Sequence, residues 1–393
     1  MTSAVIITLC VLLLLAYIFD ISSSKTKIPS VILLLLLGWI VRQITDFFKI
    51  TLPDLSPILP ILGTVGLILI VLEGSLELEF NKSKYIIIQK SFIIALLPLL
   101  LLSFGLAYCL HYLGGVSFKI GLVNAIPFTV ISSAIAIPSA RNLKPSNREF
   151  ITYESSLSDI YGVIFFNFIT LNEFIDFQSV GHFLLNIVGI IVISFISTVA
   201  LASLLSKIKH HVKFLPIILS IILIYAISKE FHLPALIFIL LFGLFLGNLD
   251  EFKQIRFIEN LKPEVLNKEV HKFKELTTEV TFLIRALFFL LFGYLIQTSE
   301  LLNIDSLVWA GGITLSIFGL RAIHLRIMKL PLQPLLYIAP RGLISVLLYL
   351  SIPAQQMMPL VNKSLILQVI ILTAFMMMLG FMQTQKNDSS INN

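Results

Sequence analysis

Long apolar runs, separated by short charged stretches, follow one another along the whole of this sequence. A helix needs roughly 20 apolar residues to cross the hydrocarbon core of a bilayer, and the runs have about that length. They predict about thirteen membrane-spanning helices: Ala4–Phe19, Ile28–Ile44, Leu55–Leu72, Tyr85–Leu113, Gly121–Ser139, Phe150–Leu171, Val180–Ser206, Phe214–Ser228, Leu233–Leu249, Leu276–Gln297, Leu307–Met328, Pro334–Ser351 and Leu365–Phe381. The pattern therefore predicts an all-α polytopic membrane protein in which residues 1–393 form a single membrane domain.

Two segments interrupt the apolar pattern. Residues 250–275 mix both signs of charge, which predicts a linker made of a helix pair. Residues 383–393 form a tail that is too short to fold by itself. Three glutamates at the end of the third span are expected on a solvated boundary: Glu73, Glu77 and Glu79.

Composition agrees with a chain solvated by lipid. Hydrophobic residues make up 57% of the chain and charged residues 13%, and the mean hydropathy is +0.98. Soluble domains carry about 25% charged residues and about 45–50% apolar ones. The two cysteines, Cys10 and Cys109, fall in different predicted spans, so they predict neither a disulfide framework nor a metal site.

The lysines and arginines of the predicted loops gather on one side of the membrane. That side holds Lys25, Lys27, Lys82, Lys84, Lys90, Arg141, Lys144, Arg148, Lys207, Lys209, Lys213, Lys253, Arg256, Lys262, Lys268, Lys272, Lys274, Arg326, Lys329 and Lys386. The other side holds only Arg42, Lys49, Lys119, Lys229 and Lys363. Because basic loops stay in the cytoplasm, we expect the N-terminus outside and the C-terminus, the 250–275 linker and the tail inside, in a bacterial inner membrane. The net charge of +6 is thus a signal of topology, and no nucleic-acid partner is predicted.

One acidic side chain lies deep inside a predicted span. Asp159 follows the start of the sixth span, Phe150, by nine residues, which places it roughly 14 Å into the bilayer. An ionisable group at that depth costs at least about 2.5–3.5 kcal/mol on insertion scales. The alternative is that Asp159 belongs to a hydrogen-bond network that holds helices together. A neutral residue would serve in such a network at a lower free-energy cost of insertion. Asp159 is therefore the leading candidate for a functional residue.

Two predicted spans carry signals of broken helices. Pro127 and Pro138 each remove a backbone donor from the fifth span, and the twelfth contains Pro340-Arg341-Gly342. Between the two prolines of the fifth span lie Thr129, Ser132 and Ser133. Paired breaks of this kind are typical of transporters with inverted repeats, in which two broken helices cross at the midplane and form the ion site.

At these residues the chain resembles the monovalent cation/proton antiporter superfamily, specifically its sodium/hydrogen exchanger branch. The segment from Glu154 to Ser158-Asp159 is similar to the Glu-x-x-x-Asn-Asp pattern of the sixth span in that branch. Further similarities, in the family's order and over nearly the whole chain, are residues 74–79, 288–293 and 340–343, and Arg321. Two departures concern the site, because Ser158 replaces the asparagine and Ser132-Ser133-Ala134 stands for Thr-Asp-Pro.

The resemblance implies a secondary antiporter that exchanges a monovalent cation, Na⁺ first, for H⁺ at Asp159. Na⁺ is then transported cargo, and no cofactor is expected. Hard oxygen ligands suit such a cation, and the candidate ion- and proton-binding residues are Asp159, Ser158, Ser132, Ser133 and Thr129. We expect electroneutral exchange, because Ser158 replaces the second acidic residue of electrogenic relatives. The resemblance also implies a homodimer in the lipid bilayer.

Charged residues elsewhere in the spans are expected to support this core. We predict that Glu154 pairs with Arg321, with Arg341 and Arg285 as alternative partners. Arg341 lies beside the break of the twelfth span, where a positive charge compensates backbone dipoles. For Arg285, the alternative to pairing with Glu154 is a purely structural role.

Other functions remain open at this point. A K⁺/H⁺ antiporter fits the same residues, and a channel or membrane sensor built on an antiporter-like core would have the same topology. An enzyme is not expected, because the sequence contains no His-Glu-x-x-His, Gly-x-Ser-x-Gly or P-loop pattern.

Overall fold

The computed structural model describes residues 2–26, 28–50, 53–78, 84–172, 177–207, 210, 212–251 and 263–391, and no strand occurs among them. The α-helices are α1 (Thr2–Thr26), α2 (Ser30–Phe47), α3 (Ile58–Glu77), α4 (Tyr85–Gly114), α5 (Phe118–Ala125), α6 (Ser133–Ala140), α7 (Pro145–Leu171), α8 (Phe177–Lys207), α9 (Phe214–Glu230), α10 (Leu236–Gly247), α12 (Pro263–Tyr294), α13 (Thr298–Leu301), α14 (Ile304–Ile327), α15 (Leu343–Leu350) and α16 (Lys363–Ile391). Three short 3₁₀ helices are η2 (Ile126–Phe128), η3 (Leu335–Tyr337) and η4 (Ala354–Gln356).

Every predicted span coincides with a helical segment, so the predicted fold class is confirmed. Within the described residues, nine segments are long and apolar enough to cross a bilayer. The remaining predicted spans coincide with α7, α9, α10 and the segment from η3 to α15. Helix α9 has only 17 residues, and α7 carries the polar stripe around Asp159.

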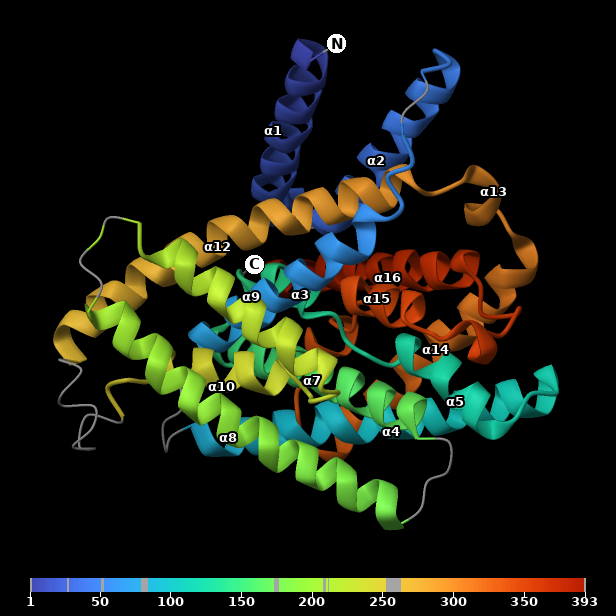
Figure 1. Ribbon diagram of the computed structural model, residues 1–393. Coiled ribbons are helices and arrows are strands. Elements are labelled where there is room, and N and C mark those ends of the chain that lie inside the picture. The colour runs from blue at the N-terminus through green and yellow to red at the C-terminus, as the bar shows by residue number, and fades with distance from the viewer. Residues whose placement is uncertain are drawn as a thin grey trace.

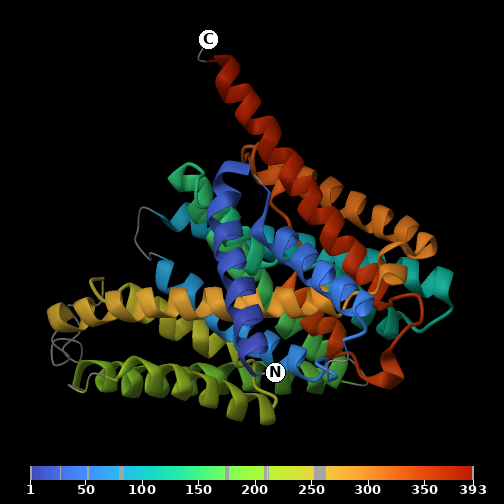
Figure 2. The same ribbon diagram turned by 90° about the horizontal axis from the view of Figure 1, so that it is seen from above.

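The helices sort by their contacts into two bundles joined by α3. One bundle contains α1, α2, α8, α9, α10 and α12 around α3, and the other contains α4 to α7 and α14 to α16. Figures 1 and 2 show α8 and α9 on one flank of the molecule and α14 on the opposite flank. Helix α3 also contacts α6, α7 and α15 of the second bundle. It therefore lies directly beside the broken helices.

The fifth and twelfth spans are both broken, and their breaks touch. After η2 the fifth span continues as non-helical backbone until α6 begins at Ser133, and the twelfth is non-helical between η3 and α15. The backbone N–H of Ser132 donates to the carbonyl of Pro340 over 2.9 Å. The two interruptions thus satisfy each other's backbone groups inside the protein, as unwound backbone at membrane depth must.

The predicted linker and the predicted C-terminal tail both contain helical extensions of membrane spans. Residues 252–262 of the 250–275 linker lie outside the described residues, and its second half belongs to α12, which runs unbroken into the tenth span. Likewise α16 extends through the predicted span to Ile391, so the backbone of the tail is helical as far as that residue.

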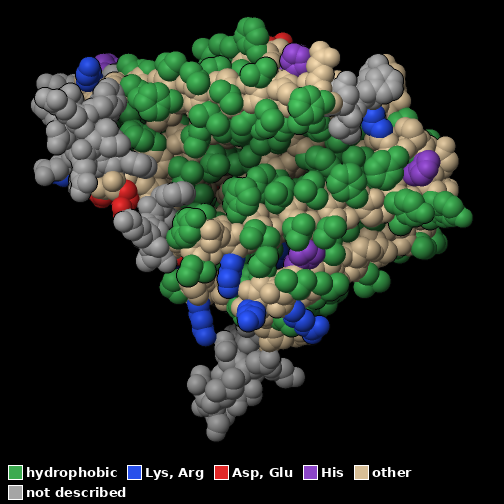
Figure 3. Space-filling view, turned by 90° about the horizontal axis from the view of Figure 1, so that it is seen from below, with side chains coloured by type: hydrophobic (Ala, Val, Ile, Leu, Met, Phe, Trp, Pro, Cys, Tyr) green, Lys and Arg blue, Asp and Glu red, His purple; other side chains and the backbone are tan. Residues whose placement is uncertain are grey.

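The surface is predominantly apolar. Figure 3 shows hydrophobic side chains over most of one face, with lysine and arginine gathered toward its lower edge. Leu185 and Phe195 of α8, for example, are 67% and 72% exposed. Apolar exposure of this extent is incompatible with a water-solvated monomer and fits a lipid-facing surface.

The placement of basic residues agrees with their division between two sides. Lys84, Arg148 and Lys274, which the sequence puts on one side, line the same cavity. Arg42 and Lys363, which it puts on the other, donate to the carbonyls at the end of α12, over 3.4 and 2.7 Å.

Candidate functional site

Helix α7 buries the central carboxylate and is packed tightly against the first break. It begins with Pro145, whose fixed φ and missing N–H suit a first helical position. Asp159 is 2% exposed. One turn further, a Cβ added to Gly162 would lie 2.3 Å from a methyl of Val130. The unwound backbone therefore lies directly against α7, beside Asp159.

The start of α6 faces the carboxylate of Asp159. The Ser133 hydroxyl, on the first residue of α6, donates to Oδ2 of Asp159. A helix N-terminus carries partial positive charge and free N–H groups, so α6 presents its positive end to Asp159. The half-helix created by the break is thus aimed at Asp159.

Two buried oxygen atoms at the site have no protein partner among the described residues. They are Oδ1 of Asp159 and Oγ of Ser132, which is 1% exposed. Buried polar atoms are nearly always hydrogen-bonded, and exceptions call for an explanation such as a water or an ion. Both atoms are oxygens, the ligands that hard cations prefer. Each of these two atoms can therefore accept one further partner.

Two of the predicted ligands hold the break instead of facing an ion. Ser158 Oγ accepts the N–H of Ile131 over 2.9 Å. Thr129 Oγ1 donates to the carbonyl of Ile126 over 2.9 Å and accepts from Ser103 of α4 over 3.1 Å. Both hydroxyls are thus hydrogen-bonded to the unwound segment or its neighbour.

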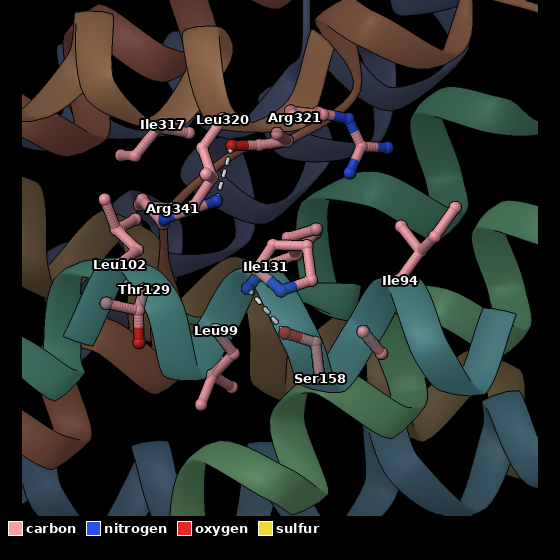
Figure 4. Close-up of a pocket in the computed structure, with 13 residues that line it drawn as sticks. Ile94, Leu99, Leu102, Thr129, Ile131, Ser158, Ile317, Leu320, Arg321 and Arg341 are labelled. Carbon is pink, nitrogen blue, oxygen red and sulfur yellow. Dashed lines mark hydrogen bonds between the residues drawn. The ribbon is translucent and has the colours of Figure 1, made fainter. Parts of the chain in front are cut away.

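A small cavity lies behind these residues, as Figure 4 shows. Its volume is about 20 Å³, which leaves room for about one water molecule. Polar atoms reach it from Thr129, Ser158, Arg321 and Arg341. The rest of the lining is apolar and comes mainly from α4, through Ile94, Ala95, Pro98, Leu99 and Leu102.

A buried ion pair joins α7 to α14. Arg321 Nη1 and Nη2 donate to the two carboxylate oxygens of Glu154 over 2.5 and 2.9 Å. The side chains are 5% and 1% exposed. Arg321 Nε donates to the carbonyl of Leu335, at the start of η3. The first-choice pairing from the sequence is thus the one present, and it also anchors the twelfth span.

Arg341 crosses between the two breaks. Its Nε donates to the carbonyl of Phe128 over 2.6 Å and its Nη1 to that of Ala339 over 2.8 Å, the latter drawn in Figure 4. Phe128 ends η2, where the half-helix has its negative end and unpaired carbonyls. Arg341 thus compensates backbone dipoles in the expected way.

Arg285 lies away from Glu154. Its Nη2 is 3.8 Å from the carboxylate of Asp20 on α1. Of the three arginines that the sequence offered as partners of Glu154, the structure pairs only Arg321 with it. Arg285 belongs to a separate, buried cluster with Asp20 that the sequence did not predict.

Two adjoining cavities, together called the passage, lie between Ser133 and the side rich in basic residues. A cavity of about 240 Å³ and a constriction of about 10 Å³ share Glu73, Ile137 and Arg141 in their linings. The constriction is also lined by Ser133, the partner of Asp159. The smaller cavity therefore ends at the residue that is hydrogen-bonded to Asp159.

Glu73 is a residue whose environment the sequence predicted wrongly. It is only partly exposed and lines the passage, whereas a solvated boundary was expected. Glu77 is exposed as expected, and Glu79 lies outside the described residues. The signal available in the sequence was the position of Glu73 directly after the apolar run Leu55–Leu72. Ser156 was also missed: its buried hydroxyl has no partner among the described residues, and it faces Gly74 of α3.

No group of three or more metal-ligating His, Cys, Asp or Glu residues occurs in the described part of the chain. The oxygen atoms around Asp159 are thus a different kind of site, with one carboxylate and hydroxyl neighbours. Such a set suits a weakly bound monovalent ion better than a resident transition metal.

Comparisons with known proteins agree with this arrangement. The family model described as "Sodium/hydrogen exchanger, transmembrane" matches residues 10–384. Two solved structures of the sodium proton antiporter MjNhaP1 from Methanocaldococcus jannaschii share the fold at 20% sequence identity. The first, at pH 8, has a TM-score of 0.64 and covers 96% of this chain and 95% of its own. The second, an electron-microscopy map, has a TM-score of 0.68 and covers 98% and 95%. No curated protein sequence matches the chain.

Proposed function

This chain belongs to the sodium/hydrogen exchanger family, and on that premise we propose that it is a secondary antiporter that exchanges Na⁺ for H⁺ at Asp159. The observation that carries the proposal is the buried carboxylate with one free oxygen, placed at the inner end of a polar passage. A group that must exchange ions with solution needs both features. A purely structural aspartate needs neither.

Competition for one carboxylate couples the two ions. A proton on Asp159 removes the negative charge that attracts a cation, and a bound cation disfavours protonation of the same group. The free Oδ1 of Asp159 and Oγ of Ser132 are the side-chain oxygens available to a cation. Ser133 stays hydrogen-bonded to Oδ2 and orients the carboxylate.

The fixed charges around the site support electroneutral exchange. Glu154 and Arg321 neutralise each other, and Arg341 is engaged with backbone carbonyls. Asp159 is then the acidic group available to carry either one proton or one monovalent cation per cycle. One carboxylate with one positive cargo in each direction moves no net charge across the membrane.

The topology completes the proposal. With the basic side placed in the cytoplasm, the passage lined by Glu73 and Arg141 opens to the cytoplasm. The N-terminus is then outside and the C-terminus inside, in a bacterial inner membrane. We include a homodimer in the proposal, since large apolar areas of the surface are available to a second copy or to lipid.

Proteoliposomes carrying an imposed ΔpH test the function. Addition of Na⁺ or Li⁺ should dissipate the gradient with wild-type protein, and Asp159→Asn should abolish this dissipation while remaining folded. Asp46→Asn is the matched control, because Asp46 is a 60% exposed acid paired with Arg42 on α2. Retained cation-coupled proton flux in Asp159→Asn sinks the proposal.

A K⁺/H⁺ antiporter is the second candidate. The observation that favours it is the replacement of a family asparagine by Ser158, whose hydroxyl is used by the backbone of Ile131. The site thus has fewer strong ligands to strip water from a small cation. K⁺ in the same assay distinguishes the two functions, and a current that ignores ΔpH would indicate a channel.

A further inference from the structure

A cluster of charged residues outside the Asp159 site connects α1 to the entrance of the passage. Asp20, near the end of α1, accepts a hydrogen bond from Ser30 Oγ over 3.2 Å. Its carboxylate is 3.4 Å from Arg141 Nη1 and 3.8 Å from Arg285 Nη2. The side chains of Asp20 and Arg285 are 18% and 5% exposed, whereas that of Arg141 is 50% exposed, so only the contact with Arg285 is well shielded from water.

Both arginines of the cluster face the route to Asp159. Arg141 and Arg285 line the constriction together with Glu73 and Ser133, and Arg141 also lines the wider cavity beyond it. Glu73 is close enough to both arginines to interact with them electrostatically. A cation on its way to Asp159 therefore passes directly beside two guanidinium groups.

The balance of charge at this constriction depends on Asp20. With Asp20 and Glu73 ionised, the two arginines are compensated. Without the charge of Asp20, the constriction is left with one uncompensated positive charge on the path of a positive ion. In the wider cavity Lys84 is paired with Glu149 and Lys274 with Glu77, while Arg148 adds a further positive charge to the lining. Glu149 and Glu77 are thus already paired and do not replace the negative charge of Asp20.

We propose that Asp20 lowers the electrostatic barrier for cations entering the passage, by compensating Arg141 and Arg285 at its constriction. The proposal rests on the antiport function proposed above. Asp20 does not touch the transported ion. It acts through the arginines, and only on the face where the passage opens.

The size of the effect follows from Coulomb's law. One unit charge several ångströms away in a partly hydrated region changes the local ion occupancy by about three- to ten-fold. The effect is screened when the ionic strength is raised with an ion that is not transported. A purely structural role for Asp20 would change stability or maximal rate, and would lack this salt dependence.

The test measures Na⁺-dependent proton flux in everted and in right-side-out membrane vesicles. Asp20→Asn keeps an oxygen that can accept from Ser30 while removing the charge. We expect the KM for Na⁺ to rise by about three- to ten-fold from one face only, with the maximal rate unchanged. Choline chloride at high concentration should shrink the difference. Asp46→Asn, at the far end of α2 from Ser30, is the matched control and should leave the KM unchanged.

Arg141→Gln extends the test in the opposite direction. Alone it should lower the KM for Na⁺ from the same face, and combined with Asp20→Asn it should restore a value near wild type. Arg141→Gln alone also tests the proposal if Asp20→Asn does not fold. An unchanged KM, an equal change from both faces, or a change confined to the maximal rate overturns the proposal. If the wild-type protein itself shows no cation-coupled flux, it is the antiport function that fails.

Discussion

At the scale of single residues, polar side chains of similar type have different roles, and their hydrogen-bond partners decide which. Ser132 and Ser133 are adjacent, yet one hydroxyl is unpartnered and the other is bonded to Asp159. Ser158 lies next to Asp159 in the sequence but is bonded to the backbone of the break. The candidate residues were identifiable from the sequence, whereas their division into ion-facing and positioning groups required the contacts.

The Glu154–Arg321 pair belongs to this scale and predicts a loss of stability. Glu154→Gln leaves Arg321 charged and buried without its partner, which costs about 3–5 kcal/mol. We therefore expect thermal unfolding in detergent at a clearly lower temperature than for wild type, together with slower exchange.

Two comparisons make the Glu154→Gln result specific. The exposed pair Arg42–Asp46, broken in Asp46→Asn, should leave the unfolding temperature nearly unchanged. Glu154→Gln combined with Arg321→Gln should be less destabilised than the single variant, since no buried charge is left uncompensated. A single variant as stable as wild type would show that the pair contributes nothing to the core.

At the scale of elements, the site depends on the close approach of two interrupted helices to α7. A Cβ on Gly342 would lie 2.9 Å from Ser132 Oγ, and one on Gly162 would lie 2.3 Å from Val130. The glycines therefore let the breaks pack directly against each other and against the helix that carries Asp159. Prolines signalled the breaks in the sequence, but this packing follows from no local pattern.

The contact between α7 and the first break predicts a compensating pair of substitutions. Gly162→Ala should push the unwound segment away from α7 and lower both exchange activity and thermal stability. The double variant Gly162→Ala with Val130→Ala should recover much of both, because the second change removes the methyl groups that the new Cβ would meet.

The control for the Gly162 series is Gly319→Ala on α14, where a Cβ would meet nothing within 4 Å. It should behave as wild type in the same ΔpH assay and the same unfolding experiment. If Gly162→Ala is as active and stable as Gly319→Ala, then the close approach at Gly162 does not position the site.

At the scale of the whole molecule, an apolar surface encloses one polar route to a buried carboxylate. Apolar residues such as Phe195 form the surface that faces lipid. The charged residues of the interior are concentrated around the passage and the breaks. In the proposed function, this is the face from which water and ions reach Asp159. Exchange across the membrane then requires a second conformation in which the other face has access.

Competition between ions at a single carboxylate predicts a pH dependence. With equal pH on both sides, lowering the pH should raise the apparent KM for Na⁺ by up to about ten-fold per pH unit, because protons occupy the group that binds the cation. The maximal rate should change much less at saturating Na⁺. A KM independent of pH, measured as ²²Na⁺ exchange in proteoliposomes, would show that cation and proton use separate groups.

The sequence by itself determined the membrane class, the spans, the two interrupted helices and the burial of Asp159. These features depend on local composition and on the length of each apolar run. In a bilayer such a run must form a helix, because only then are its backbone groups hydrogen-bonded. The partner of Glu154 was also predicted, because few charges in the spans were available to neutralise it. The tertiary structure decided what depends on contacts between distant segments. It alone showed that Ser158 and Thr129 support the break, that Glu73 lines the passage, and that Asp20 reaches Arg141 across 121 positions of sequence. Such contacts are created when the helices pack, and no periodicity along the chain encodes them.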